Sequence, residues 1–167
     1  DALVNGPFWA TDYGLGGMQW GASEVFGEIK NQLKDHPDLQ ISLSPSWANG
    51  TDTIAEFFFE GDLPFKMESI EGYFDRKQPL DASRLFIMIP EEYHMVIESP
   101  KFTHIQVEKI IDTPDGQPGF YFVRLEYSTE MDAILAQESA QRKALQTQDV
   151  TINNFAATVR FSSLDMG

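Results

Sequence analysis

The sequence contains no cysteine among its 167 residues. Without thiols the chain can form neither disulfides nor thiolate metal sites, and it has no cysteine nucleophile. Long hydrophobic runs are absent too, since no apolar stretch approaches the roughly 20 residues that a membrane-spanning helix needs. We therefore expect a soluble domain.

Positive charge is scarce. The chain has 12 Lys and Arg against 26 Asp and Glu, which gives a formal net charge of -14. Binding of DNA or RNA needs clustered cations that replace counterions, and here the cations are scattered, so we expect no nucleic-acid partner. Hydrophobic residues make up 42% of the chain, including 13 Phe. This apolar content is enough for one folded core.

Several stretches have the apolar spacing of amphipathic helices. The apolar positions are Val25, Phe26, Ile29 and Leu33 in the first, Ile54, Phe57 and Phe58 in the second, and Met131, Ile134 and Leu135 in the last. Pro37 is expected to stop the first helix because proline cannot continue it. Thr51 or Asp52 is a candidate N-cap for the second, and Ser128 for the last, which runs to about residue 145. Pro90 suits the first position of a short helix.

Strands are predicted for residues 6–13, 39–43, 65–70 and 85–89. The last of these is apolar throughout, which is typical of a strand buried on both faces. Residues 104–111 and 120–125 flank a segment with Pro114 and Gly116, and this arrangement predicts a β-hairpin. Residues 150–161 have strand-like spacing in pieces.

Alternating strands and helices favour an α/β fold. We expect a three-layer Rossmann-like sandwich with a mostly parallel sheet and an antiparallel hairpin at one edge. Residues 1–146 form the predicted α/β domain, and residues 147–167 fit either a terminal strand or the start of a truncated following segment. Since the chain begins at Asp1 without Met, we expect it to be a piece of a longer protein.

Two loops, residues 12–21 and 44–52, each follow a predicted strand and precede a predicted helix. Such loops lie at the carboxyl ends of strands, where ligands bind. The candidate ligand-binding residues are Asp12, Tyr13, Gly16, Gly17, Gln19 and Trp20 in the first loop, and Ser44, Trp47, Asn49 and Asp52 in the second. Aromatic faces beside amides and carboxylates suit a neutral polyol such as a sugar. The same residues also have a structural explanation, because Gly allows tight turns, Trp fills cores and Ser, Asn and Asp cap helices.

Sharper motifs are incomplete. Gly14 and Gly16 fit a dinucleotide-binding fingerprint, but Gln19 stands where its third glycine belongs. The chain has no phosphate-binding P-loop and no Gly-x-Ser-x-Gly nucleophile elbow. The histidines are His36, His94 and His104. Glu91 and Glu92 lie near His94, and a solvated helix start explains this trio better than a metal site. We expect no metal and no cofactor, and no catalytic residue can be named.

The two loops carry a resemblance. Asp12-Tyr13-Gly14 and the following Gly16-Gly17-Met18-Gln19-Trp20-Gly21-Ala22, with Ser-Pro-Ser-Trp-Ala-Asn-Gly-Thr-Asp at 44–52, resemble the soluble C-terminal region of large bacterial membrane glycosyltransferases. These enzymes use polyprenyl-phosphate sugars and are related to the protein mannosyltransferases. The resemblance spans residues 8–60. It implies a parent with many membrane spans and a domain on the extracytoplasmic side of the cell membrane, with the catalytic carboxylate in the membrane part.

The resemblance implies an accessory domain that binds or positions a glycan or an acceptor and is not itself catalytic. Its partners would be the membrane-embedded part of the same polypeptide and the glycan or acceptor. If Trp47 stacks on a sugar, we expect it to be partly exposed, whereas a core Trp would be buried. Two alternatives stay open: a free-standing enzyme acting on a sugar or nucleotide, with Asp12 or Asp52 as base, and a non-catalytic structural or protein-interaction domain.

Overall fold

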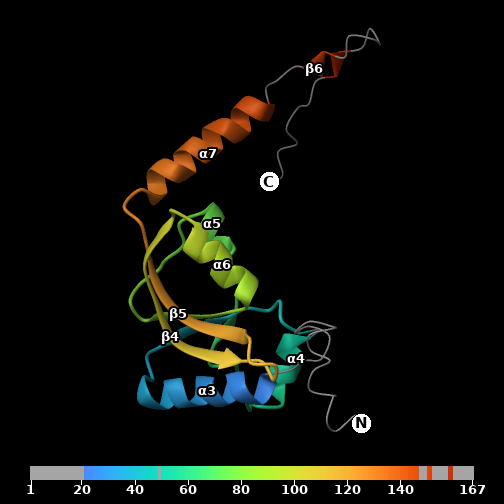
Figure 1. Cartoon of the computed structure of the whole chain (residues 1–167), viewed down its shortest axis with the longest axis vertical. Helices are drawn as coiled ribbons and strands as arrows, with labels where there is room; N and C mark the ends of the chain where they lie inside the picture. Colours follow the sequence, from blue (N-terminus) through green and yellow to red (C-terminus); the bar gives the residue numbers. More distant parts are fainter. Residues whose placement is uncertain (1–20, 49, 147–149, 152–157, 160–167) are drawn as a thin grey trace. The chain divides into compact units, whose positions relative to one another are not determined.

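The computed structural model describes residues 21–48, 50–146, 150–151 and 158–159. The chain forms two compact units, residues 1–128 and residues 129–167, and each is described by itself (Figure 1). The strand predicted for residues 6–13 lies outside the described residues, as do residues 12–20 of the first loop.

A five-stranded sheet with the order β2-β1-β3-β5-β4 forms the centre of the first unit. The strands are β1 (Gln40–Leu43), β2 (Lys66–Met67), β3 (Arg84–Met88), β4 (Phe102–Asp112) and β5 (Pro118–Tyr127). β1 pairs in parallel with β2 and β3, while β5 pairs antiparallel with β3 and β4. The predicted hairpin at one edge is confirmed, but the sheet is mixed rather than mostly parallel, since half of its pairings are antiparallel.

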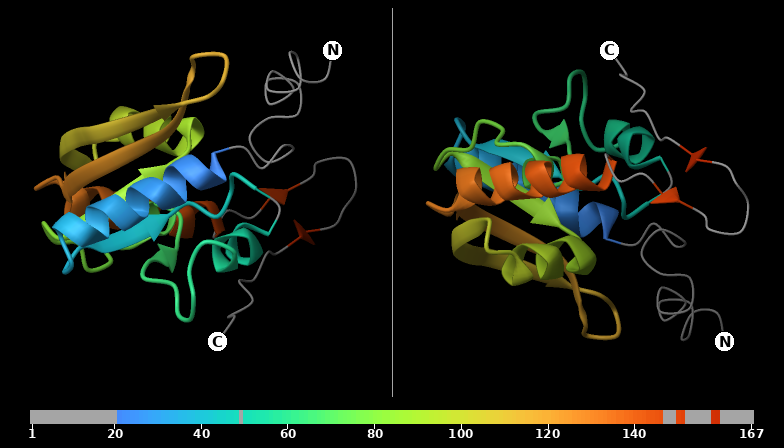
Figure 2. Two further views of the ribbon diagram at one scale, coloured as in Figure 1. Left: turned by 90° about the horizontal axis from the view of Figure 1, so that it is seen from below. Right: turned by 90° about the horizontal axis from the view of Figure 1, so that it is seen from above.

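Helices cover both faces of this sheet. They are α3 (Ala22–Asp35), α4 (Thr51–Glu56), α5 (Gly72–Asp75) and α6 (Pro90–Glu98). Side chains of α3 and α4 join one core cluster, and side chains of α5 and α6 join the other. Figure 2 shows α3 and α6 on opposite sides of the sheet.

β3 divides the two clusters. Leu85 and Ile87 point into the first cluster, and Phe86 and Met88 into the second. Successive side chains of a strand point to opposite faces, so a strand covered on both sides is apolar throughout. All five residues of β3 are buried, which confirms the prediction made from residues 85–89.

The helix starts agree with the sequence only in part. α6 begins at Pro90 as predicted. α4 begins at Thr51, but no side chain caps it, and the preceding Gly50 has a φ of 74°. The Thr51 hydroxyl instead donates to the backbone oxygens of Pro45 and Ala48, at 3.0 and 3.1 Å. The predicted capping by Thr51 or Asp52 is therefore wrong, because the left-handed glycine turns the chain into the helix without a cap.

The hairpin turn has the predicted chemistry. Gly116 has a φ of 81°, and its N–H donates to the backbone oxygen of Thr113 at 2.8 Å. The N–H of Thr113 donates in turn to the backbone oxygen of Gln117 at 2.7 Å. A positive φ at this point is easily adopted only by glycine.

The second unit contains α7 (Met131–Gln146) and a short antiparallel pair, β6 (Val150–Thr151) and β7 (Thr158–Val159). The predicted capping of this helix by Ser128 is wrong, because the Ser128 hydroxyl has no hydrogen-bond partner among the described residues. A domain boundary after residue 146 stays a prediction. Within the described ranges, no helix is long and apolar enough to cross a membrane.

Candidate functional site

Three polar side chains meet where the parallel strands end. Ser44 directly follows β1, Ser69 follows β2, and Glu92 lies in the first turn of α6, just after β3. Because β2, β1 and β3 are parallel neighbours, these residues share one edge of the sheet, which we call the carboxyl edge. We call the three residues the carboxyl-edge cluster.

The carboxyl edge is also a point where the chain changes sides. After β1 the chain continues into α4, which packs in the first core cluster, whereas after β3 it continues into α6, which packs in the second. The two connections leave neighbouring parallel strands toward opposite faces. In open α/β sheets, ligands bind in the crevice that forms at such a switch point.

Glu92 is the buried charged group of this cluster, with 3% of its surface exposed. The Ser69 hydroxyl donates to Oε1 of Glu92 at 2.6 Å and accepts the N–H of Glu71 at 3.1 Å. Burial raises the pKa of the Glu92 carboxyl above its ordinary value, while hydrogen bonds from Ser69, Ser44 and the Ile89 backbone oppose the rise. Glu92 therefore keeps its proton to a higher pH than a carboxyl in water.

Ser44 is held rigidly beside Glu92. Its N–H donates to the backbone oxygen of Ile87 at 2.9 Å, which extends the pairing of β1 and β3 by one residue. Its hydroxyl accepts the N–H of Ser46 at 3.3 Å. The Ser44 hydroxyl proton is directed at the Glu92 carboxyl, which accepts it.

A cavity of about 310 Å³ lies along the loop that follows β1. Its walls come from Pro45, Ala48, Gly50, Thr51, Asp52 and Met67. Asp52 is exposed and supplies a carboxylate, whereas the Thr51 hydroxyl is engaged by backbone oxygens. The volume falls at the small end of the range for ligand pockets, about 300–1,000 Å³.

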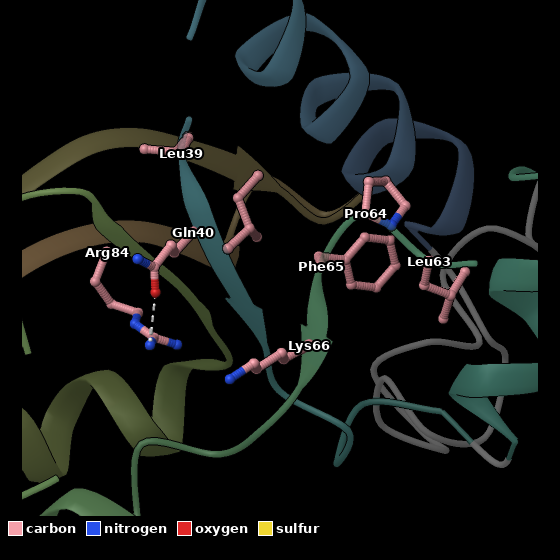
Figure 3. A pocket seen from close by; sticks show the side chains of 8 residues that line it. Leu39, Gln40, Leu63, Pro64, Phe65, Lys66 and Arg84 are labelled. Carbon is pink, nitrogen blue, oxygen red and sulfur yellow. Dashed lines mark hydrogen bonds between the residues drawn. The ribbon is translucent and has the colours of Figure 1, made fainter. Parts of the chain in front are cut away.

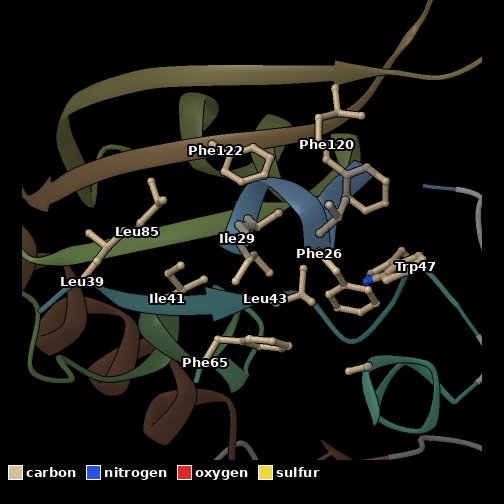
Figure 4. Packing of buried hydrophobic residues seen from close by; sticks show 14 residues of the cluster. Phe26, Ile29, Leu39, Ile41, Leu43, Trp47, Phe65, Leu85, Phe120 and Phe122 are labelled. Carbon is tan, nitrogen blue, oxygen red and sulfur yellow. The ribbon is translucent and has the colours of Figure 1, made fainter. Parts of the chain in front are cut away.

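Trp47 belongs to the core. Its side chain has no exposed surface, and its ring packs edge-on against Phe120 with centroids 5.3 Å apart and lies 6.0 Å from the ring of Phe26 (Figure 4). A buried ring offers no face to a sugar, so the partial exposure expected of a stacking Trp47 is not found. The indole N–H is buried without a hydrogen-bond partner in the described part of the chain.

The described ends of the two predicted loops meet at Phe120. Gly21 closes the first loop with a φ of 90°, and a Cβ at this position would lie 2.6 Å from Cε2 of Phe120. Trp47 of the second loop contacts the same ring. The convergence of residues 12–20 with the second loop stays a prediction. It concerns Asp12, Tyr13, Gly16, Gly17, Gln19 and Trp20, which lie outside the described residues together with Asn49.

Sequence reasoning identified Ser44 and Asp52 but missed Ser69 and Glu92. The sequence predicts a solvated helix start for Glu91, Glu92 and His94; Glu91 and His94 are exposed, whereas Glu92 is buried. The available signal was the spacing of Glu92 and Val96, which lie four residues apart and are the buried residues of α6. Nothing local identifies Ser69, because its role depends on how β2 pairs with β1.

No group of three potential metal ligands occurs among the residues that the structure describes. Comparison of the chain with protein-family models, curated proteins and solved structures finds no match. The function must therefore be argued from the carboxyl edge itself.

Proposed function

We propose that the first unit is a binding domain whose carboxyl edge takes a neutral, hydroxyl-rich ligand, a glycan or a glycan-bearing acceptor. Two observations carry the proposal: Ser44, Ser69 and Glu92 meet at a switch point, and the loop that directly follows Ser44 carries a cavity lined by Asp52. Hydroxyls and carboxyls supply the donors and acceptors that sugar hydroxyls need. For the fold we propose a three-layer Rossmann-like arrangement, which the core clusters on both faces support.

We further propose that this domain is an extracytoplasmic accessory part of a membrane glycosyltransferase. The resemblance of residues 12–22 and 44–52 supports this role. A net charge of -14 is compatible with a neutral ligand and unfavourable for a polyanionic one. Catalysis would belong to the membrane-embedded part of the same polypeptide, so we expect no sugar transfer by the present chain from lipid-linked or nucleotide donors.

A catalytic role is the second candidate. A buried carboxyl with a raised pKa at the ligand-binding edge of a sheet is typical of a general acid. Turnover of a sugar or nucleotide substrate by the chain, lost in Glu92→Gln, would favour this role. The burial of Trp47 favours a third candidate, a structural or protein-interaction domain, which would bind no glycan.

Calorimetric titration with a panel of neutral oligosaccharides tests the proposal. Asp52→Asn removes the exposed carboxylate of the cavity, and Glu56→Gln is its matched control at the other end of α4. We expect Asp52→Asn to weaken binding by about tenfold or more, because hydrogen bonds to a charged group contribute about 1.5–3 kcal/mol. Glu56→Gln should bind as the wild type does. Absence of binding across the panel, or equal effects of the two variants, would contradict the proposal.

A further inference from the structure

A second cavity, of about 270 Å³, lies at the opposite end of the parallel strands, where β1 and β2 begin (Figure 3). Its polar lining is Gln40, Lys66 and Arg84, and its apolar walls include Leu39, Leu63 and Phe65. Although the chain is strongly acidic, the described lining of this cavity has two cations and no carboxylate. Glu68, outside the lining, already pairs with Arg84, so the charge available to an anion comes from the Arg84 donors that Glu68 does not use and from Lys66.

Arg84 is the buried cation of the cavity, with 8% of its surface exposed. Its Nη1 donates to Ser42 Oγ at 2.9 Å and to Glu68 Oε2 at 3.4 Å. Its Nη2 donates to Gln40 Oε1 at 3.0 Å. Nε is buried and has no partner within the described residues. A guanidinium carries five N–H donors, so one on Nη2 and the one on Nε remain unused.

The unpartnered Nε donor lies on the edge of the guanidinium that also carries Nη2. Nε and Nη2 form one of the forks through which arginine binds the two oxygens of a carboxylate. A buried, unsatisfied donor on a charged group is costly and calls for an explanation. An acceptor that is absent from the chain itself would explain it.

Gln40 occupies part of this edge with a neutral acceptor. Gln40 is exposed, so its side chain can move away without unpacking the core. A carboxylate oxygen makes a stronger hydrogen bond to a guanidinium than an amide oxygen does. The Gln40 amide therefore stands where a ligand carboxylate would bind more tightly.

Lys66 provides a second positive group on the same face. It is paired in register with Ser42, the residue whose hydroxyl accepts from Arg84. Figure 3 shows the ammonium of Lys66 directed to the side of β1 on which the Arg84 guanidinium lies. Glu68 is already engaged by the hydroxyls of Ser42 and Tyr73, at 3.0 and 3.1 Å.

We propose that this cavity binds a small organic carboxylate with an apolar body. The carboxylate displaces the Gln40 amide from Arg84 and takes the Nε and Nη2 donors, and Lys66 provides a second contact. The apolar body packs against Leu63 and Pro64, the less buried apolar residues of the lining. This site is separate from the carboxyl edge and does not depend on the glycan proposal.

Titration of the isotope-labelled full chain with benzoate, followed by amide chemical shifts, tests the site. We expect shifts around residues 39–42, 63–66 and 84. Benzamide should bind at least about tenfold more weakly than benzoate, because it lacks the charge. Equal binding of the two probes, or no shift at the solubility limit of benzoate, would overturn the proposal.

Gln40→Glu gives the sharpest variant. It places a carboxylate of the chain itself on Arg84, so we expect benzoate binding to be lost while the spectrum stays that of a folded protein. Gln40→Ala should bind benzoate as well as the wild type or better. Wild-type benzoate affinity in Gln40→Glu would overturn the proposal.

Two lysine substitutions, one in the cavity and one elsewhere, give an independent check if Gln40→Glu does not fold. Lys66→Gln should weaken benzoate binding about tenfold, whereas Lys34→Gln, at an exposed lysine on α3, should not. Equal effects of the two substitutions would show that only the general charge of the chain matters, and the site would be rejected.

Discussion

At the scale of the residue, Glu92 is the most informative side chain of the carboxyl edge. Two adjacent glutamates begin α6, and one is exposed while the other is buried against Ser69. Burial of a carboxyl costs stability unless it is protonated or well hydrogen-bonded. Groups that carry such a cost are common at functional sites. Glu92 lies at the ends of β1, β2 and β3, a position where a functional residue is expected.

The stability of the protein should therefore depend on the ionisation of Glu92. The folded-state pKa is raised above the ordinary 4.5, so the folded state binds this proton more tightly than the unfolded state does. Stability from this group is fully present below pH 4.5 and is lost as the pH rises through the raised pKa. Glu92→Gln cannot ionise, so we expect a higher urea midpoint than wild type at pH 7 and a smaller difference near pH 4.

Glu91→Gln is the matched control, since Glu91 is the exposed neighbour in the same helical turn. Its urea midpoint should follow that of the wild type across the pH range. If Glu92→Gln and the wild type lose stability in parallel with rising pH, ionisation of Glu92 does not cause the pH dependence.

At the scale of the element, α3 is anchored to the sheet at its first turn. Gly21 precedes the helix with a φ of 90° and lies against Phe120, the ring that also contacts Trp47. An alanine there meets both a strained backbone and the edge of a buried ring. The helix start and the loop after β1 thus depend on one side chain of β5.

Two glycine substitutions in this region should have opposite effects. Gly21→Ala places a Cβ 2.6 Å from the Phe120 ring at a positive φ, so we expect a loss of about 1–3 kcal/mol in the free energy of unfolding. Gly27→Ala, inside α3, meets nothing within 4 Å, and we expect a gain of about 0.5–1 kcal/mol. Urea unfolding of both variants measures the contrast. A Gly21→Ala protein as stable as Gly27→Ala would mean that α3 is not anchored in this way.

The elements also show which structural features a sequence can reveal. β3, the Pro90 start of α6 and the hairpin turn at Gly116 were predicted because each has a strong local signal: an apolar run, a fixed φ or a positive φ. The caps at Thr51 and Ser128 were predicted wrongly. A cap requires a particular backbone geometry at the helix start, and residue type alone does not determine that geometry.

The site was predictable to a smaller extent than the elements. The order of strands and helices indicated that residues 44–52 would follow a parallel strand, and this placed Ser44 and Asp52 correctly at the carboxyl edge. The burial of Trp47 and the contact between Ser69 and Glu92 are features of the tertiary structure. They arise from strand order and from packing between segments far apart in the chain, which local patterns do not encode.

At the scale of the whole molecule, the two proposed sites use opposite ends of the same three parallel strands. The carboxyl edge presents hydroxyls and carboxyls, whereas the cavity at the strand starts presents Lys66 and Arg84. In a chain with a net charge of -14, such separation allows a neutral and an anionic ligand to be distinguished by charge.

The central claim is that the carboxyl edge binds ligand, and amide shift mapping during titration with a neutral oligosaccharide tests it most directly. We predict that the largest shifts fall on residues 44–52, on Ser69 and on Glu92, and that they shrink in Asp52→Asn but not in Glu56→Gln. Shifts confined to other parts of the chain, or none at saturating sugar, would contradict the claim.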